Sequence, residues 1–320
     1  METQSRLDEL RKRIDEIDDQ LMPLFNERMK VVHAVGALKG QTGQSVTDVA
    51  REQQVVKKAL AHVEEDLHGE AAMFMRTAIA LSREYQNRLL LPSEPPWLSA
   101  FNPPSDKPAG SGQPARLVCA YQGLPQSLGE RTAARLFDQP TLVPLETVQA
   151  VFAAVIGRQA DFGLVPIEDT RLGVISETLG LLHISDCFIV RRATVVDDIS
   201  GQDMQTSRAS FVVVGRQAEA LAESRLVAIS FILPDKAGAL CEALLPIAAA
   251  VLNMRSLSVR PDGEGGCGCF IELEGNIADK NVVTALQQVA AVSRQFKVLG
   301  CYGEAVWDGP LEGMTKGFCE

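Results

Sequence analysis

Apolar residues at helical spacing dominate the first 91 residues of the chain. Between residues 7 and 24 they recur at alternating steps of three and four, the spacing of a helix that packs along another helix. Two further helices are predicted over roughly 47–65 and 68–91. Pro23 lies inside the first helix, and because an interior proline distorts a helix, we expect a bend there and not a break. The N-terminal region, 1–91, is therefore predicted to be an all-α domain.

Prolines mark the next segment, residues 92–115, which holds seven of the sixteen prolines in the chain. Proline lacks the amide donor that helices and central strands need, so neither is expected to continue through this stretch. We interpret it as a semi-rigid linker and a domain boundary.

Strand-like and helix-like segments alternate after the linker, which predicts an α/β lobe over 116–215. Its predicted strands are 116–121, 141–146, 161–166, 187–196 and 210–215, and its predicted helices are 126–137, 147–158 and 174–183. Over 226–305 the order becomes strand, helix, two strands, helix, strand, which predicts a ferredoxin-like α+β domain. Residues 306–320 are expected to be a tail, so the whole chain is predicted to be multidomain.

Charge and composition exclude several classes of protein. The formal net charge of −10 argues against a general nucleic-acid binder. The N-terminus has no apolar signal segment, and the longest apolar run, 243–252, is too short to span a membrane, so we expect a cytoplasmic protein. The seven cysteines contain no C-x-x-C pair and the four histidines show no ligand spacing. We therefore expect reduced thiols and no metal site.

Polar residues interrupt the apolar helical faces, and this pattern points to a buried site. The residues are Arg11, Arg28, Lys39, Asp48, Arg51, Glu52, Ser82 and Gln86. Any one of them alone is more simply a surface charge or an internal salt bridge. Together, four cations outnumber two carboxylates, and an inward-facing cationic cavity favours an anionic ligand, most simply one with two carboxylates. Neither a nucleophile–base pair nor a cofactor motif is evident, which favours catalysis by holding one conformer and stabilising developing charge.

Residues 5–91 resemble, at these polar positions, the all-helical chorismate mutase domain of bacterial bifunctional chorismate mutase–prephenate dehydratases. The resemblance implies conversion of chorismate to prephenate by a [3,3] rearrangement, without a cofactor, in an intertwined homodimer. It implies catalytic roles for Lys39 and Gln86, which would donate to the breaking ether bond, and for Glu52, which would orient the ring hydroxyl. The implied substrate-binding residues are Arg11 (supplied by the partner subunit), Arg28, Asp48, Arg51 and Ser82.

Residues 116–215 resemble only part of a prephenate dehydratase domain. Glu168, Asp169 and Thr170 match a strand-end motif of that family, except that asparagine is usual at the position of Asp169. The family then adds a second lobe and a strand with a Thr-Arg-Phe motif, whereas this chain has only a short segment before Ser207. A dehydratase holds its substrate between two lobes. We therefore expect dehydratase activity to be lost or very weak, and the remnants of its site to be Glu168, Asp169, Thr170 and Ser207.

Residues 226–305 resemble an ACT domain of the dehydratase type. Gly238, Ala239 and Leu240 match one effector motif of the family, and Arg260 lies in a second motif that is only half retained. The resemblance implies that these residues bind phenylalanine as an effector between paired ACT domains. A domain that only dimerises is the alternative. For the whole chain, the alternatives to a regulated mutase are a fully bifunctional enzyme and a non-enzymatic amino-acid sensor.

Overall fold

The computed structural model describes residues 2–101, 117–169, 173–197, 207–219 and 222–308. The chain divides into two compact units, Met1–Ser93 and Glu94–Glu320. Each unit is described by itself.

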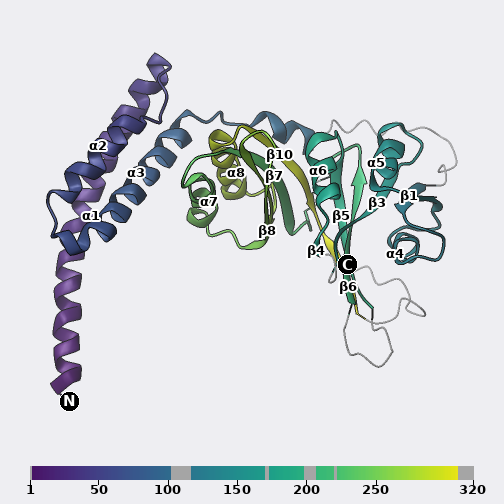
Figure 1. Cartoon of the computed structure of the whole chain (residues 1–320), viewed down its shortest axis with the longest axis horizontal. Helices are drawn as coiled ribbons and strands as arrows, with labels where there is room; N and C mark the ends of the chain where they lie inside the picture. Colours follow the sequence, from purple (N-terminus) through teal and green to yellow (C-terminus); the bar gives the residue numbers. More distant parts are fainter. Residues whose placement is uncertain (1, 102–116, 170–172, 198–206, 220–221, 309–320) are drawn as a thin grey trace. The chain divides into compact units, whose positions relative to one another are not determined.

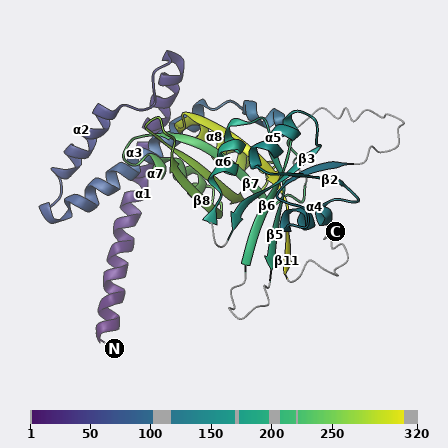
Figure 2. The same cartoon turned by 45° about the vertical axis from the view of Figure 1, so that its right-hand side comes forward.

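The first unit is entirely helical (Figures 1 and 2). It consists of α1 (Glu2–Thr42), α2 (Val49–Leu60), a short 3-10 helix (Glu65–Leu67) and α3 (His68–Leu90). Both α1 and α2 pack against α3. The three predicted helices are therefore present, although α2 ends earlier than expected. Helix α1 runs through Pro23 without a break.

The apolar seam of α1 is largely open to solvent in the single chain. Leu10, Ile14 and Ile17 are each more than half exposed. Among the described residues of this unit, Ala72 and Ile79 are the buried apolar side chains. A continuous apolar stripe of this length on a polar helix is typical of a surface that another protein chain covers.

The second unit contains a seven-stranded mixed sheet in the order β11-β5-β6-β3-β1-β2, with β4 paired to β3. Its strands are β1 (Val118–Gln122), β2 (Thr141–Leu145), β3 (Phe162–Asp169), β4 (Gly173–Val174), β5 (Phe188–Asp197), β6 (Ser207–Gly215) and β11 (Glu304–Asp308). Strand β1 lies parallel to β2 and β3, whereas β6 lies antiparallel to both β3 and β5.

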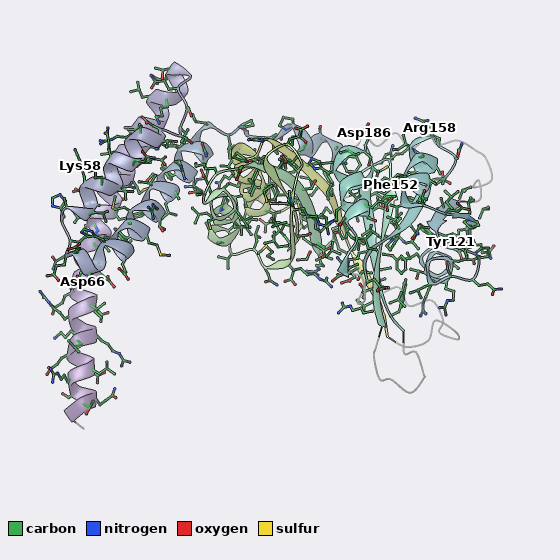
Figure 3. All side chains as sticks on the ribbon, in the orientation of Figure 1. Lys58, Asp66, Tyr121, Phe152, Arg158 and Asp186 are labelled. Atoms are coloured by element: carbon green, nitrogen blue, oxygen red, sulfur yellow. The ribbon has the colours of Figure 1, made fainter. Side chains whose placement is uncertain are left out.

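Helices cover both faces of this sheet. They are α4 (Leu128–Leu136), α5 (Val148–Ile156) and α6 (Ser176–Ile184). Successive residues of a strand point to opposite faces, so Tyr121 packs on the α4 side and Ala120 on the side of α5 and α6. Tyr121 and Phe152, labelled in Figure 3, belong to these two separate cores. The result is a three-layer arrangement, and it agrees with the sequence prediction that this region is an α/β lobe.

A four-stranded antiparallel sheet in the order β10-β7-β9-β8 completes the second unit. Its elements are β7 (Leu226–Pro234), α7 (Ala239–Ala249), β8 (Met254–Pro261), β9 (Gly266–Glu274), α8 (Lys280–Val292) and β10 (Gln295–Tyr302). This is the predicted βαββαβ order. Alternate residues of β7 point to the two faces: Ile229 packs in the core with α7 and α8, and Ala228 packs in the core of the α/β lobe. The lobe and the ferredoxin-like region therefore share one core.

Two segments differ from the sequence prediction. Pro96–Phe101, expected to be linker, forms a 3-10 helix whose Phe101 is buried in the ferredoxin-like core, with its ring 5.8 Å from that of Phe188. Residues 102–115 of the predicted linker lie outside the described residues. Strand β11, of which residues 306–308 were expected to be tail, pairs in parallel with β5. Both segments are ordered by partners distant in the sequence, which local patterns do not reveal.

Candidate active site

Arg28 and Ser82 meet where α1 packs on α3. The Nη1 of Arg28 donates to the carbonyl oxygen of Ala78 at 3.1 Å and to the hydroxyl of Ser82. The Ser82 hydroxyl in turn donates to the Ala78 carbonyl at 2.6 Å. Partial burial lowers the pKa of the Arg28 guanidinium. The structure thus brings together two residues that the sequence placed in one site.

Gln86 lies one turn beyond Ser82, on the same face of α3, and is buried. Gly36 of α1 faces it, and a Cβ atom at Gly36 would lie 3.0 Å from Cγ of Gln86. Among the described residues, Oε1 of Gln86 has no hydrogen-bond partner. A buried amide oxygen without a hydrogen bond is energetically costly. A hydrogen-bond donor from a ligand or from a partner chain would therefore stabilise the Gln86 side chain.

Lys39 follows Gly36 by three residues and therefore lies near the same face of α1. Its Nζ donates to the carbonyl oxygen of Val46 at 2.8 Å, in the loop between α1 and α2. Val46 lies two residues before Asp48, which is the N-cap of α2 and accepts from the backbone N–H of Arg51 at 3.0 Å. In the single chain Asp48 therefore has a structural role that the sequence analysis did not predict.

Glu52 is paired with Arg83, a residue that the sequence analysis missed. Nη1 of Arg83 donates to both carboxylate oxygens of Glu52, at 3.1 and 3.0 Å. The Arg83 side chain is only 12% exposed and the Glu52 side chain 24% exposed. The one feature of the sequence that could have indicated Arg83 is its place directly after Ser82, on a helix expected to pack against other helices.

Arg11 is separated from these residues within the chain. It precedes Arg28 by 17 residues on one helix, which at 1.5 Å per residue is about 25 Å along the axis. Its Nη1 pairs with Asp8 at 3.3 Å, and both side chains are exposed. The single chain therefore unites Arg28 with Ser82 and sets Gln86 one turn further along α3, but it does not bring Arg11 to them.

The predicted dehydratase remnants lie at the edge of the lobe. Glu168 and Asp169 end β3, and Oε2 of Glu168 pairs with Nη2 of Arg192 at 3.3 Å while its side chain stays 52% exposed. Thr170 lies outside the described residues. The backbone of Ser207 begins β6 and pairs with Asp197 at the end of β5. Only nine residues separate these two paired positions in the sequence, so β5 leads directly to its neighbour in the sheet.

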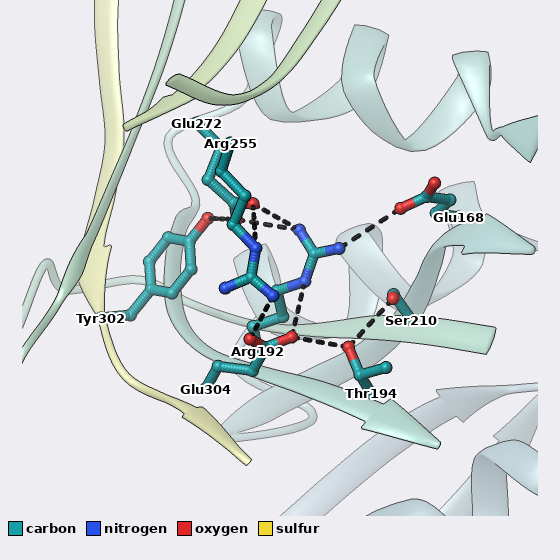
Figure 4. Close-up of polar contacts among 8 residues, drawn as sticks. All are labelled: Glu168, Arg192, Thr194, Ser210, Arg255, Glu272, Tyr302 and Glu304. Carbon is teal, nitrogen blue, oxygen red and sulfur yellow. Dashed lines mark hydrogen bonds and ion pairs between the residues drawn. The ribbon is translucent and has the colours of Figure 1, made fainter. Parts of the chain in front are cut away.

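A buried ionic network, which no pattern in the sequence indicates, joins the lobe to the ferredoxin-like region (Figure 4). Arg192 of β5 donates to both oxygens of Glu272 on β9, at 2.9 and 2.7 Å, and pairs with Glu304 at 3.3 Å. The hydroxyl of Tyr302 donates to Glu272 at 2.7 Å, and Arg255 pairs with Glu304 at 2.5 Å. Burial by itself would lower the pKa of Arg192, but the charge of Glu272 and its neighbours outweighs burial and raises it.

A cavity of about 430 Å³ lies between α6 and the four-stranded sheet. Arg260 lines it and donates from Nη2 to the carbonyl oxygen of Val174 at 3.1 Å, while its buried Nη1 has no hydrogen-bond partner among the described residues. On the same lining, His183 hydrogen bonds to Ser230 at 2.7 Å and to Gln295 at 3.0 Å.

The other three predicted effector residues lie elsewhere. Gly238, with φ +83°, is the N-cap of α7. Ala239 and Leu240 begin that helix and pack against the hydrophobic core of the ferredoxin-like region. None of the three lines the cavity. The structure therefore does not bring Arg260 and the α7 start into one site within the chain.

The described ranges show no cluster of three or more histidine, cysteine, aspartate or glutamate side chains placed to hold a metal ion. In the same ranges, none of the helices has the length and apolar character needed to cross a membrane.

Two family models match the chain, chorismate mutase type II over residues 10–87 and prephenate dehydratase over residues 119–199. The bifunctional chorismate mutase/prephenate dehydratase of Aquifex aeolicus is 21% identical and aligns with 94% of this chain and 98% of its own. The chain thus carries a segment similar to each of the two enzyme domains of the bifunctional chorismate mutase/prephenate dehydratases. The corresponding enzyme of Neisseria gonorrhoeae is 22% identical over 92% of this chain and 96% of its own.

Two further comparisons concern the length of the chain and its fold. The alignment with the Aquifex protein runs over 380 positions, more than the 320 residues of this chain, so the relative carries segments that this chain lacks. A solved structure, prephenate dehydratase from Arthrobacter aurescens in complex with L-Phe, has a TM-score of 0.50 at 17% identity. It covers 58% of this chain and 90% of its own, which shows a likeness of fold.

Proposed function

We propose that this protein is a chorismate mutase of aromatic amino acid biosynthesis that converts chorismate to prephenate in the helical unit. The observation that carries the proposal is Arg28, a partly buried guanidinium held between α1 and α3 by Ala78 and Ser82. A fixed cation that contacts Ser82, one helical turn from the buried side chain of Gln86, suits a dianionic substrate whose ether bond gains negative charge as it breaks. The chorismate mutase type II match over the same residues supports this role.

The proposal includes a homodimer. Arg11 lies about 25 Å along α1 from Arg28, too far to reach the same ligand within one chain. The apolar seam between them, which includes Ile14 and Ile17, is exposed in the single chain. A second copy laid along α1 would cover this seam and deliver its own Arg11 to the site.

We further propose that the dehydratase reaction is lost or very weak. The lobe has one sheet, and its β5 leads into neighbouring β6 with nine intervening residues, which is too few for a second lobe. A substrate on one lobe would stay open to water, so loss of water and carbon dioxide would proceed without a closed cleft. A fully bifunctional enzyme is the alternative, and the names of the relatives favour it.

A single assay tests these proposals. Purified full-length protein is supplied with chorismate, and both prephenate and phenylpyruvate are followed. We expect prephenate to accumulate, Arg28→Ala to abolish its formation, and circular dichroism to show an intact helical unit. Arg13→Ala removes an exposed arginine of the same helix and is expected to retain activity. Full activity in Arg28→Ala would refute the site, and phenylpyruvate formation at the mutase rate would establish the bifunctional alternative.

Regulation by an amino acid is a second proposal, favoured by the cavity that Arg260 lines. The buried Nη1 of Arg260, which has no hydrogen-bond partner within the described part of the chain, is placed to bind a carboxylate. The L-Phe complex of the Arthrobacter protein suggests phenylalanine as the first ligand to test. Calorimetry with phenylalanine should give heat that Arg260→Met removes. No heat, together with an unchanged mutase rate, would refute regulation. Heat without any conversion of chorismate would instead establish a sensor.

A further inference from the structure

The ion pair between Glu52 and Arg83 connects the candidate active site to an arginine outside the eight predicted site residues. We propose that Arg83 is a positioning residue that holds the Glu52 carboxylate in place for the substrate hydroxyl; this rests on the proposed mutase function. One nitrogen, Nη1 of Arg83, lies 3.1 and 3.0 Å from the two carboxylate oxygens. This nearly symmetric contact fixes the plane of the carboxylate, whose remaining lone pairs stay available to a ligand hydroxyl.

Arg83 also has an effect on the charges around the site. A largely buried carboxylate needs a counter-charge, and Arg83 supplies the one that the structure shows for Glu52. In the structure Arg28 donates to Ala78 and Ser82, and Lys39 donates to Val46, so neither is paired with Glu52. Arg83 therefore leaves these two cations available to an anionic substrate.

The position of Arg83 on α3 allows this role. Ser82 and Gln86 lie on the face of α3 that packs against α1, as shown by their contacts with Arg28 and Gly36. The next residue, Arg83, is turned by about 100° around the helix and reaches α2. Helix α3 thus presents ligand groups on one face and orients Glu52 with the other.

Kinetics of full-length variants with chorismate test the inference. Arg83→Met keeps an unbranched side chain but removes the charge, and we expect KM to rise about tenfold while kcat changes less than threefold. The reason is that a contact to the ring hydroxyl is equally strong in the ground and transition states. Arg83→Lys restores a cation and should keep KM within about threefold of the wild type. Arg88→Met removes an exposed arginine of the same helix and should leave both constants unchanged.

A double-mutant cycle separates positioning from simple helix packing. In a Glu52→Gln background, Arg83→Met should raise KM by less than a further twofold, because its effect passes through Glu52. The inference would be overturned if the effects of the two substitutions on KM were additive. It would also be overturned if Arg83→Met changed the melting temperature without changing the kinetics, or if it increased activity. A wild-type protein that leaves chorismate unchanged would overturn the proposed function and this inference together.

Discussion

Replacing Arg192 with methionine should destabilise the second unit strongly. The side chain of Arg192 is 7% exposed and that of Glu272 is fully buried. Removal of the guanidinium leaves Glu272 with the hydroxyl of Tyr302 and with Arg255, whose Nε lies 3.9 Å away. Breaking a buried ion pair from one side costs about 3–5 kcal/mol, and because Arg255 remains, we expect about 3 kcal/mol.

Urea unfolding followed by tryptophan fluorescence measures this loss selectively. The chain has two tryptophans, Trp97 and Trp307, and both belong to the second unit. Their signal therefore reports that unit, while the helical unit is followed by circular dichroism at 222 nm. For a unit of this size, 3 kcal/mol corresponds to a decrease in melting temperature of roughly 6–12 °C.

Two controls distinguish the buried charge from general packing. Glu168→Gln removes the half-exposed partner of Arg192 and should cost less than about 1 kcal/mol. Adding Glu272→Gln to Arg192→Met neutralises the orphaned carboxylate and should recover part of the loss. A cost below about 1 kcal/mol for Arg192→Met, or no recovery in the double variant, would refute the reasoning.

Three further predictions concern the rest of the chain. Gly36→Val places a branched side chain where even a Cβ atom would lie 3.0 Å from Cγ of Gln86. The substitution should destabilise the helical unit by about 1–3 kcal/mol and lower mutase activity. An unchanged unfolding curve would contradict this. Ile14→Asp puts a charge on the exposed seam of α1 and should yield a monomer without mutase activity by light scattering, whereas Asp15→Asn should not; an active monomer would argue against the dimer. Burial raises the pKa of the Cys119 thiol from 9.0 to about 12. Above pH 9 the thiol therefore ionises in the unfolded chain while it stays protonated in the folded chain. The free energy of unfolding then falls with rising pH, by at most about 1.4 kcal/mol per pH unit from this group. Urea titrations from pH 8 to 10.5 should therefore show a shallower decline in Cys119→Ala than in the wild type, and equal slopes would refute this.

The candidate site shows how far sequence patterns reach. The positions of Arg28, Ser82 and Gln86 could be predicted because each interrupts a helical apolar face, and a helix fixes which residues share a face. Arg83 shares no such pattern. Its role depends on how α2 packs against α3, which the spacing along α3 does not contain.

Local patterns predict the three N-terminal helices, the alternating α/β lobe and the βαββαβ order, because hydrophobic periodicity and turn residues act over a few neighbouring positions. The pairing of β11 with β5, the burial of Phe101 and the ion pair between Arg192 and Glu272, which are 80 residues apart, depend instead on tertiary packing. These contacts form between surfaces that exist only after the elements have folded. For the same reason, the lobe and the ferredoxin-like region, which the sequence separates into two domains, share one hydrophobic core.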